Sequence, residues 1–407
     1  YYSTKDFTNV GEITITITGK GNYVGAVNKT YSITKRQVTL TSEGGSKPYD
    51  GIALTKPDVA IGGDGFVNGE VSDIKATGSV TNVSDGEVTN TITYTPSKKF
   101  NKNNYQITKT EGKLSITAVE AEVQVQIVGA TDTVGYDGHE HRVEGYTVTI
   151  NNDKYHEADF TFSGNKVAKG INAGTYNMEL AVEQFKNNSS NFSNVTFTVT
   201  DGYLVITPKS INTEDQKITV SDPQGHVYDG NPHQEVLVVR DAELDKTLKS
   251  GKDYDVYYST KDFTNVGKIT ITITGKGNYT GTFDRTYEIT QATLTVTTPS
   301  ANKVYDGTPL MAEGTISGFV NKETATFTTT GSQTEVGSSS NTYLIEWNGT
   351  AKSSNYQISE TVGTLTVTEN ENEIVVTTKH SSYTYDGLAH GTEVTVSNLP
   401  KGYSLDK

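Results

Sequence analysis

The sequence predicts an all-β protein: a tandem array of small β-sandwich modules of about 80–90 residues, stacked end to end. Residues 1–34 recur at 257–290 with only seven substitutions, which marks an internal repeat. Composition agrees, because Tyr (24 residues), Thr, Val and Ile are abundant while Leu and Ala, the common helix formers, are sparse. Alternation of apolar and polar residues inside the repeat is the third observation, and it predicts strands.

Three recurring signatures mark the modules. Tyr-Asp-Gly begins at Tyr49, Tyr136, Tyr228, Tyr305 and Tyr385. A closing strand of the type Leu-Ser-Ile-Thr has its last Ile or Val at Ile33, Ile116, Ile206, Ile289 and Val367, which are 83, 90, 83 and 78 residues apart. An Asn-aromatic pair precedes each closing residue: Asn22-Tyr23, Asn104-Tyr105, Asn191-Phe192, Asn278-Tyr279 and Asn355-Tyr356.

These signatures predict four complete modules between two partial ones. Module 1 (1–35) is the C-terminal part of a module, and module 6 (370–407) is the N-terminal part. The complete ones are module 2 (36–118), module 3 (119–208, a divergent subtype), module 4 (209–290) and module 5 (291–369). The chain starts without Met and stops inside a module, so we expect a piece of a longer protein. Junctions such as 288–296 contain no Gly- or Pro-rich linker, which predicts a stiff rod.

Strict alternation defines individual strands. In 267–274 every Ile falls on one face and every Thr on the other, so we expect Ile271 to be buried and Thr272 exposed. The same pattern predicts strands through Ile13, Ile15 and Ile17 in module 1 and through Tyr176, Met178, Leu180 and Val182 in module 3. Helical periodicity is absent, and 241–248 is expected to form at most one helical turn.

The repeated phrases of modules 2 and 5 resemble the MBG family. Gly-Phe-Val-Asn-Gly-Glu at 65–70 returns as Gly-Phe-Val-Asn-Lys-Glu at 318–323. Modules 1 and 4 resemble the related YDG-type modules, through the stretch 253–281 of module 4; module 3 keeps the frame but departs from it at 143–169. The likeness covers most of the chain. It implies Ig-like β-sandwiches, in long cell-wall-associated surface proteins and adhesins of mainly Gram-positive bacteria, and it carries over no catalytic residues.

Charge and composition exclude several partners. A net charge of −14 disfavours nucleic acid and anionic membrane surfaces, which are bound by clustered Lys and Arg. No apolar run approaches the ~18–20 residues that span a bilayer. The absence of Cys excludes disulfides and thiol chemistry. We therefore expect no nucleic-acid partner and no membrane insertion of this fragment.

The regular Tyr-Asp-Gly triplet is interpreted as a fold determinant rather than a binding site. In Asp-Gly turns the Asp side chain bonds nearby backbone N–H groups and Gly accepts a positive φ. The Tyr ring is expected to lie on the core with its hydroxyl bonded at the rim. We accordingly expect Gly230 and Gly307 to have positive φ angles.

His139-Glu140-His141 is the one cluster with metal-ligand character, because alternate strand residues face the same way. Other modules carry His233, His390, Leu54 or Leu310 at the position of His141. A position that exchanges His with Leu indicates packing, and zinc would need further ligands. No transition-metal site is expected.

Acidic loop residues leave two interpretations open, calcium ligands or solvated carboxylates; they are Asp64, Glu70, Asp222 and Asp229. Trp347, the only tryptophan, is either a core residue, which we favour, or an isolated platform. There is no nucleophile motif, and the turn at 275–277 is expected to be a hairpin rather than a phosphate loop. We therefore assign no catalytic, cofactor-binding or metal residues, expect no enzymatic activity, and leave ligand-binding residues unassigned.

The preferred function is a structural stalk segment that projects a distal binding domain of an adhesin-like protein from the bacterial cell wall. The segment is expected to be extracellular and monomeric. The alternative is binding of host or environmental glycans or proteins through loops that vary between repeats. Ala26, Val27 and Asn28 become Thr282, Phe283 and Asp284, a cluster of differences that permits such a recognition edge. A third interpretation is an accessory region of a hydrolase whose catalytic domain lies elsewhere in the parent protein.

Overall fold

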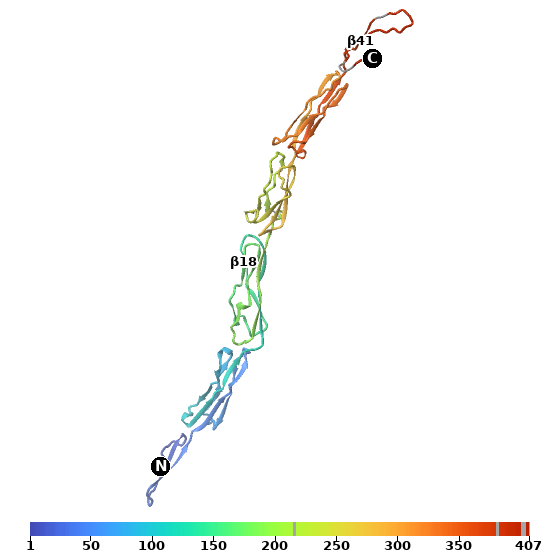
Figure 1. The fold of residues 1–407 in the computed structure, drawn as a ribbon. Coiled ribbons are helices and arrows are strands. Elements are labelled where there is room, and N and C mark those ends of the chain that lie inside the picture. Colours follow the sequence, from blue (N-terminus) through green and yellow to red (C-terminus); the bar gives the residue numbers. More distant parts are fainter. Residues whose placement is uncertain (215–216, 380–381, 400–403, 407) are drawn as a thin grey trace. The chain divides into compact units, whose positions relative to one another are not determined.

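The computed structural model describes residues 1–214, 217–379, 382–399 and 404–406, which form strands joined by turns (Figure 1). The helices of this described part are five 3-10 turns of three residues each, and none is an α-helix. They are η1 (Val83–Asp85), η2 (Lys102–Asn104), η3 (Glu157–Asp159), η4 (Val182–Gln184) and η5 (Ser353–Asn355). Within the same residues, no helix has the length and apolarity to cross a membrane. The predicted all-β class is confirmed, since the regular elements of the described residues are strands and single 3-10 turns.

Internal contacts divide the chain into two compact units, and each is described by itself. The first comprises Tyr1–Val134 and His139–Ile206, and the second comprises Gly135–Gly138 and Thr207–Lys407. This division is coarser than the six predicted modules, whose boundaries stay a prediction. Every sheet draws its strands from one of those modules only.

The first unit contains the hairpin of module 1 and the sheets of modules 2 and 3. Module 1 has β1 (Gly11–Thr18) and β2 (Ala26–Ile33), paired antiparallel. Module 2 has β3 (Arg36–Ser42), β4 (Gly45–Pro48), β5 (Leu54–Thr55), β6 (Val59–Gly63), β7 (Val71–Ala76), β8 (Ser79–Val80), β9 (Val88–Thr89), β10 (Ile92–Pro96), β11 (Tyr105–Thr110) and β12 (Lys113–Thr117). Its sheets are β11-β3-β6, β4-β12-β9, β10-β7 and β5-β8.

Module 3 continues the first unit with ten strands. They are β13 (Val123–Gly129), β14 (Thr131–Gly135), β15 (His141–Glu144), β16 (Tyr146–Ile150), β17 (Phe160–Phe162), β18 (Val167–Gly170; labelled in Figure 1), β19 (Gly174–Asn177), β20 (Phe185–Asn187), β21 (Val195–Thr200) and β22 (Tyr203–Thr207). The sheets are β16-β13-β21, β14-β22-β19, β15-β18 and β17-β20.

The second unit contains modules 4 and 5 and the strands of module 6. Module 4 has β23 (Lys209–Ser210), β24 (Ile218–Val220), β25 (His226–Val227), β26 (Val239–Asp241), β27 (Lys246–Thr247), β28 (Tyr254–Tyr258), β29 (Gly267–Gly275), β30 (Tyr279–Thr280) and β31 (Thr282–Thr290), in sheets β25-β31-β29-β28, β24-β26-β27 and β23-β30. Module 5 has β32 (Ala292–Thr297), β33 (Ala301–Val304), β34 (Thr315–Ser317), β35 (Thr326–Thr329), β36 (Gly337–Ser340), β37 (Tyr343–Glu346), β38 (Tyr356–Thr361) and β39 (Thr364–Thr368), in sheets β34-β32-β38, β33-β39-β36 and β35-β37. Module 6 has β40 (Val375–Thr378) paired with β41 (Val394–Ser397).

The complete modules pair strands from their two ends in parallel. In module 5, β32 pairs with β38 over six residue pairs and β33 with β39 over four. Module 2 repeats this with β3 and β11 over six pairs and β4 and β12 over four. Module 3 pairs β13 with β21 over six. Module 4 has much shorter parallel contacts, two pairs between β23 and β30 and two between β25 and β31. The two ends of each sequence segment are thus held side by side by backbone hydrogen bonds.

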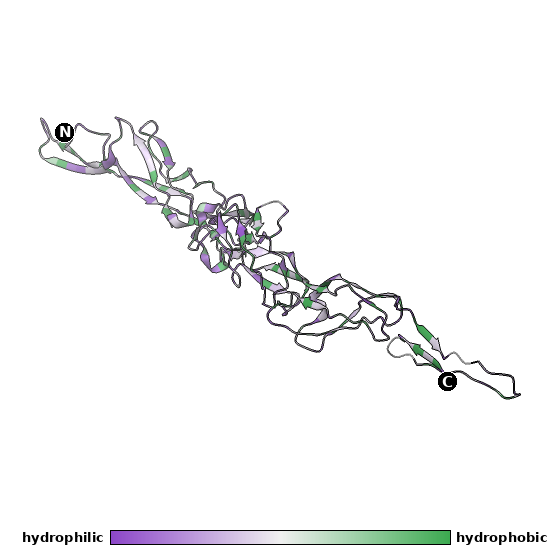
Figure 2. Ribbon diagram, turned by 90° about the horizontal axis from the view of Figure 1, so that it is seen from above, coloured by the Kyte–Doolittle hydropathy of each residue, from purple (hydrophilic) through white to green (hydrophobic). Residues whose placement is uncertain are grey.

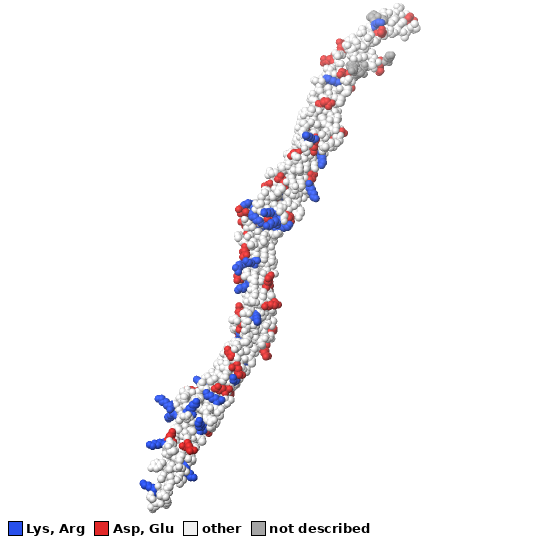
Figure 3. All heavy atoms as spheres, turned by 60° about the vertical axis from the view of Figure 1, so that its left-hand side comes forward, with Lys and Arg blue, Asp and Glu red and all other residues white. Residues whose placement is uncertain are grey.

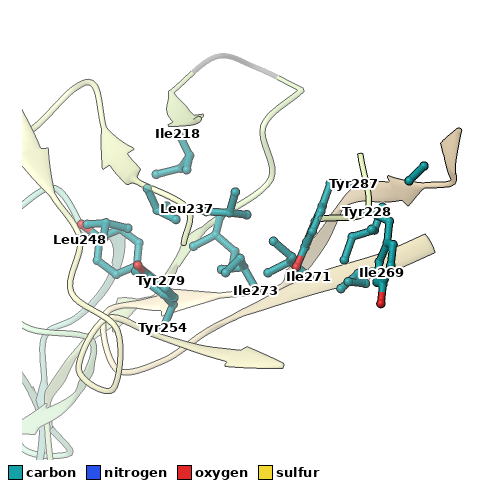
Figure 4. Packing of buried hydrophobic residues seen from close by; sticks show 14 of the residues in the cluster. Ile218, Tyr228, Leu237, Leu248, Tyr254, Ile269, Ile271, Ile273, Tyr279 and Tyr287 are labelled. Carbon is teal, nitrogen blue, oxygen red and sulfur yellow. The ribbon is translucent and has the colours of Figure 1, made fainter. Parts of the chain in front are cut away.

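Alternation in β29 builds the core of module 4. Ile269, Ile271 and Ile273 are buried along one face of this strand (Figure 4). Thr272 is half-buried rather than exposed as predicted, because β28 and β31 flank it and its hydroxyl donates to Asp284 Oδ1 at 2.7 Å. Green and purple segments also follow one another along several strands in Figure 2. In the twin strand β1 the burial fades, since Ile17 is 65% exposed.

The prediction of one long strand through Tyr176, Met178, Leu180 and Val182 in module 3 is wrong. β19 ends at Asn177, and Glu179 takes a positive φ of 63°. The Asp201 carboxylate causes this turn, since it accepts hydrogen bonds from the backbone N–H groups of Glu179 and Leu180 at 3.2 and 2.9 Å. Apolar and polar residues keep alternating through this bend, so the sequence pattern does not reveal it. The residue that stabilises the bend, Asp201, lies far along the chain.

The segment 241–248 forms a β-hairpin, not the helical turn allowed by the sequence. It joins β26 to β27, which pair antiparallel, and Asp245 has a φ of 51°. The carboxylate of Asp241 accepts the backbone N–H groups of Glu243 and Leu244 at 3.1 and 3.2 Å, which closes the turn.

The Tyr-Asp-Gly triplet forms the predicted turn. The glycines at 51, 138, 230, 307 and 387 have φ angles between 76° and 82°. Where the bond is described, the Asp carboxylate accepts the backbone N–H of the residue two positions on, as Asp229 does from Asn231 at 2.9 Å. The prediction for Gly230 and Gly307 is therefore confirmed, and glycine is required because other residues adopt this φ with strain.

Candidate functional site: the joints between modules

The most regular polar arrangement in the molecule lies where one module meets the next. At the joint of modules 1 and 2, the side-chain Oδ1 of Asn104 accepts the backbone N–H of Val10 at 2.9 Å. Its Nδ2 donates to Oδ1 of Asn9 at 2.8 Å, and Asn101 donates to the same oxygen at 3.0 Å. A single carboxamide thus binds both residues of an Asn-Val dipeptide in the preceding module.

The same arrangement recurs at two further joints. Between modules 2 and 3, Asn191 accepts from Val83 N at 2.9 Å and donates to Asn82 Oδ1 at 3.1 Å. Between modules 4 and 5, Asn355 accepts from Val266 N at 3.1 Å and donates to Asn265 Oδ1 at 2.9 Å. We call this arrangement the Asn clasp: the Asn of an Asn-aromatic pair bonded to an Asn-Val dipeptide one module earlier. Asn355 is fully buried, so its two bonds are shielded from water.

Local chemistry fixes the Asn-Val side of the clasp. In module 4 the carboxylate of Asp262 accepts the backbone N–H groups of Thr264 and Asn265, each at 3.0 Å, and the Nδ2 of Asn265 at 2.6 Å. These bonds, that from the Asn265 side chain first, lower the pKa of Asp262, so the carboxylate stays ionised. Asp6 holds Asn9 in the same way in module 1.

Aromatic rings accompany the clasp. Tyr49 of module 2 packs edge-on against Phe192 of module 3, with ring centroids 5.6 Å apart at 76°. Tyr228 of module 4 packs on Tyr356 of module 5 with the same separation, at 84°. In both cases the ring of a Tyr-Asp-Gly triplet meets the aromatic partner of a clasp asparagine, and edge-to-face pairs of this kind add stability beyond their buried area.

Glu323 links modules 4 and 5 through two tyrosines. Its Oε1 accepts the hydroxyl of Tyr228 at 2.5 Å, and its Oε2 accepts that of Tyr356 at 2.6 Å. In module 2, Glu70 accepts the hydroxyl of Tyr105 at 2.6 Å. Module 3 has Phe192 at this position, and its sequence lacks the Gly-Phe-Val-Asn phrase that carries the glutamate. Module 3 thus has neither the tyrosine hydroxyl nor the glutamate that accepts it in modules 2 and 5.

The hydrophobic core is continuous across the joint of modules 4 and 5. A single cluster of buried side chains runs from Ile211 in module 4 to Tyr356 in module 5. Trp347 packs against this cluster and stacks on Tyr356, with centroids 6.1 Å apart, as expected of a core residue. Gly230 lies so close to Asn321 of module 5 that an added Cβ would meet its Cβ at 2.7 Å. Modules 4 and 5 therefore fold against one another over apolar as well as polar surface.

The acidic residues considered as calcium ligands have separate partners. Asp64 accepts the backbone N–H of Gln37 at 2.9 Å, and Glu70 binds Tyr105 as described. Asp222 faces Arg285 at 3.6 Å, and Asp229 binds His233 Nε2 at 2.9 Å. The bonds to Asn231 and His233 lower the pKa of Asp229 to about 2.

The His139-Glu140-His141 cluster is split between a turn and a strand. His141 begins β15 and is half-buried, while His139 is exposed in the preceding turn and Glu140 pairs with Lys169 at 3.2 Å. Among the residues that the structure describes, no group of three or more His, Asp or Glu side chains is placed to hold a metal ion.

One hollow of neutral polar residues lies on the outer face of the sheet β16-β13-β21 in module 3. It has a volume of about 400 Å³ and is lined by Gln124, Gln126, Thr149, Asn151, Thr196 and Thr198. On the face seen in Figure 3, charged side chains of both signs are present, and most of that face carries neither.

Comparisons with solved structures give distant likenesses to three multidomain proteins. The N-terminal eight Ig domains of Down Syndrome Cell Adhesion Molecule isoform 1.30.30 align over 95% of this chain and 64% of theirs, at 10% identity and a TM-score of 0.17. The Protocadherin GammaB4 extracellular domain aligns over 96% and 78%, at 8% identity and a TM-score of 0.24. The I9–I11 tandem from titin aligns over 60% and 100%, at 11% identity and a TM-score of 0.17. At such TM-scores the likenesses carry no argument.

A family model gives the one specific assignment. No curated protein matches the chain. Residues 294–366, from the first strand of module 5 to the last, match the model of the MBG domain of the YGX type. These residues hold Glu323, Asn355 and Tyr356, the module 5 side of the joint. Module 5 is thus similar to the MBG domain, the family that its repeated phrases resemble.

Proposed function

We propose that this chain is a stalk segment of a bacterial cell-surface, adhesin-like protein, which projects a distal binding domain from the cell wall. The segment works outside the cell and as a monomer, and it has no enzymatic activity of its own. Its contribution is length and stiffness. Contacts with host or environmental molecules belong to other parts of the parent protein.

The Asn clasp is the observation that supports this proposal. One carboxamide binds an N–H and an amide oxygen of the neighbouring module at three joints, with nearly the same distances. Two directional bonds to a fixed dipeptide restrict bending, and the edge-on rings at Tyr49 and Tyr228 restrict it further. Between β31 and β32 only Gln291 separates two modules, so the chain itself leaves little freedom.

Small-angle scattering of the whole chain tests the stalk. A strand of ~8–10 residues rises about 3.3 Å per residue, so four complete modules end to end should exceed about 100 Å in maximum dimension. The triple variant Asn104→Ala, Asn191→Ala and Asn355→Ala should be shorter and more flexible, while each module stays folded by circular dichroism.

Asn165→Ala is the matched control. Its carboxamide also makes two backbone bonds, both to Val167 within module 3, so its loss should leave the scattering curve unchanged. Identical curves for the wild type and the triple variant, or a compact wild type, would contradict the proposal.

A second candidate is the recognition of a neutral glycan. The three differences that suggested variable loops fall on β2 and β31, so they no longer motivate a loop site. The hollow of module 3 suggests instead a binding site on the face of a sheet. Its uncharged amides and hydroxyls can form hydrogen bonds with the hydroxyl groups of a sugar. Titration calorimetry with neutral oligosaccharides, on the wild type and on Gln126→Leu with Thr198→Val, tests it. If the wild type gives no heat of binding at millimolar sugar, this candidate function is excluded.

A further inference from the structure

The parallel strands at the ends of each module determine how it responds to pulling. When tension acts along the array, it enters a module at its first strand and leaves at its last. In module 5 the first strand β32 is pulled at its N-terminal end, whereas β38 is pulled toward its C-terminal end through β39. Two parallel strands pulled at opposite ends slide along one another, so all their hydrogen bonds bear the force together.

Peeling would require the opposite arrangement. If two paired strands are pulled apart from the same end, the bonds break one at a time, each bearing the whole force alone. A ladder of six pairs loaded along its length therefore ruptures at a much higher force than the same ladder peeled. Modules 2 and 3 carry equivalent ladders, β3 with β11 and β13 with β21.

Among the residues of module 4 that the structure describes, no such ladder is found. Its first strand β23 contacts β30 over two residue pairs, supported by backbone bonds from Lys209 to Asn278 and from Ile211 to Thr280, both 2.9 Å. The second parallel contact, β25 with β31, is equally short. The side chain of Lys209 adds an anchor, because its Nζ binds Asp241 at 2.7 Å and Glu243 at 2.8 Å. This ion pair at the pulled end is expected to resist the applied force less well than the four further residue pairs that the ladder of module 5 has.

We infer that modules 2, 3 and 5 are tension-resistant clamps and that module 4 is a built-in extensible element, which unfolds first under load and refolds when the load falls. The inference deepens the proposed stalk, which supplies the tension, but the difference in strength belongs to the modules themselves. Release of about 80 residues adds up to about 280 Å of chain, so one yielding module absorbs a large displacement.

Single-molecule pulling on the full chain tests this directly, because the absence of Cys allows attachment at chosen residues. The pair Pro208→Cys and Gln291→Cys loads module 4 alone, and the pair Gln291→Cys and Glu369→Cys loads module 5 alone. All three positions are exposed. Gln291 donates to Ser354 O and Tyr356 O, so its replacement weakens module 5 and biases the test against the expected result.

A third pair is the control for direction. Gln291→Cys and Ser354→Cys load β32 and β38 from the same end, because Ala292 is in register with Tyr356. At one loading rate we expect the highest rupture force for module 5 pulled end to end and roughly half that force for module 4. The peeled pair should give the lowest. Circular dichroism of each variant confirms that the modules are folded before pulling.

Two results would overturn the inference. One is a rupture force for module 4 equal to or above that of module 5. The other is equal forces for the end-to-end and peeled pairs of module 5, because the ladder would then not be loaded in shear. Either result leaves the scattering test of the stalk unaffected. Conversely, flexible joints in solution would contradict the stalk while leaving the order of rupture forces intact.

Discussion

Module 4 begins with β23, a strand of two residues, whereas module 5 begins with β32, a strand of six. Both then form a Tyr-Asp-Gly turn, an Asn-Tyr pair and a closing strand. Module 4 buries charge where its ladder is short: Lys209 binds the fully buried Asp241, and Lys246 binds the buried Asp253 at 3.1 Å. The buried polar side chains of module 5 are neutral, namely Thr298, Asn341 and Asn355.

The comparison shows that modules with the same signatures can hold their first strand in place in two ways, by a backbone ladder or by buried ion pairs. A backbone ladder is insensitive to side-chain identity and resists sliding. An ion pair depends on two specific side chains and costs desolvation, which its hydrogen bonds must offset. Burial alone would lower the pKa of Lys209, but the bonds to Asp241 and Glu243 outweigh it and raise that pKa. The following substitutions test how far module 4 depends on its charges and on module 5.

The largest effect is expected for Lys209→Met. It leaves the Asp241 carboxylate buried without its cation, which typically costs about 3–5 kcal/mol. Denaturant unfolding should show a transition of module 4 moved to lower denaturant, with modules 2 and 3 unchanged. Lys276→Met is the matched control, because its partner Asp255 has a side chain 39% exposed and surface pairs contribute about 0–1 kcal/mol. Equal losses for both variants would show that burial of the pair is unimportant.

Next comes Ile271→Ala, which truncates a fully buried side chain and should destabilise module 4 by about 2–5 kcal/mol. Hydrogen exchange followed by mass spectrometry resolves the response of each module. Since one cluster spans modules 4 and 5, module 5 should lose some protection, less than module 4, and modules 2 and 3 none. Leu294→Ala provides the reciprocal measurement from module 5. Uniform loss along the whole chain would contradict modular folding.

A smaller effect is expected for Tyr228→Phe, which removes one of the two hydroxyls bound to Glu323. A hydrogen bond to a charged group contributes about 1.5–3 kcal/mol. Burial, and then the bond to Glu323, raises the pKa of both Tyr228 and Tyr356. Their contribution is complete below the pKa of an unfolded tyrosine, about 10, and is lost as pH rises toward the folded values. Stability of modules 4 and 5 should fall in alkaline solution, and less steeply in the variant.

The smallest difference separates Gly230→Ala from Gly51→Ala. Both glycines have nearly the same positive φ, 77° and 79°, so both variants should lose about 1–2 kcal/mol to backbone strain. At Gly230 the new Cβ would meet Asn321 of module 5 at 2.7 Å, whereas at Gly51 the nearest atom is Cδ of Lys154 in module 3, at an ordinary contact distance of 3.8 Å. The excess cost at Gly230, measured by thermal unfolding, reports the packing of the joint. No excess would mean that Asn321 moves aside freely.

Local chemistry made part of this structure predictable. Asp-Gly determines its own turn through a carboxylate two residues from its N–H partner, and the Ile/Thr alternation of β29 determines its buried face. The bend at Glu179 was not predictable in this way, because the residue that stabilises it, Asp201, stands 22 positions away. Alternation continues through the bend, so the sequence pattern alone indicated one long strand.

The role of the joint residues was only partly visible in the sequence. The Asn-aromatic pair was recognised as a marker of each module, but its partners lie about one module earlier, as 94 positions separate Val10 from Asn104. Glu70 was considered as a calcium ligand, whereas it binds Tyr105. A partial signal existed, since modules 2 and 5 share both the glutamate phrase and an Asn-Tyr pair, although module 4 has an Asn-Tyr pair without the phrase.

The Asn clasp has a consequence for how such a chain changes in evolution. Each clasp consists of one asparagine on one side and an Asn-Val dipeptide on the other, a small set of residues compared with the modules that it joins. Unequal recombination between repeated gene segments adds or removes whole modules. Because modules 1, 2 and 4 carry the Asn-Val dipeptide and modules 2, 3 and 5 carry the matching asparagine, recombination that joins one of the former to one of the latter brings complementary ends together. Modules 1 and 4, almost identical over 34 residues, are what such duplication leaves behind.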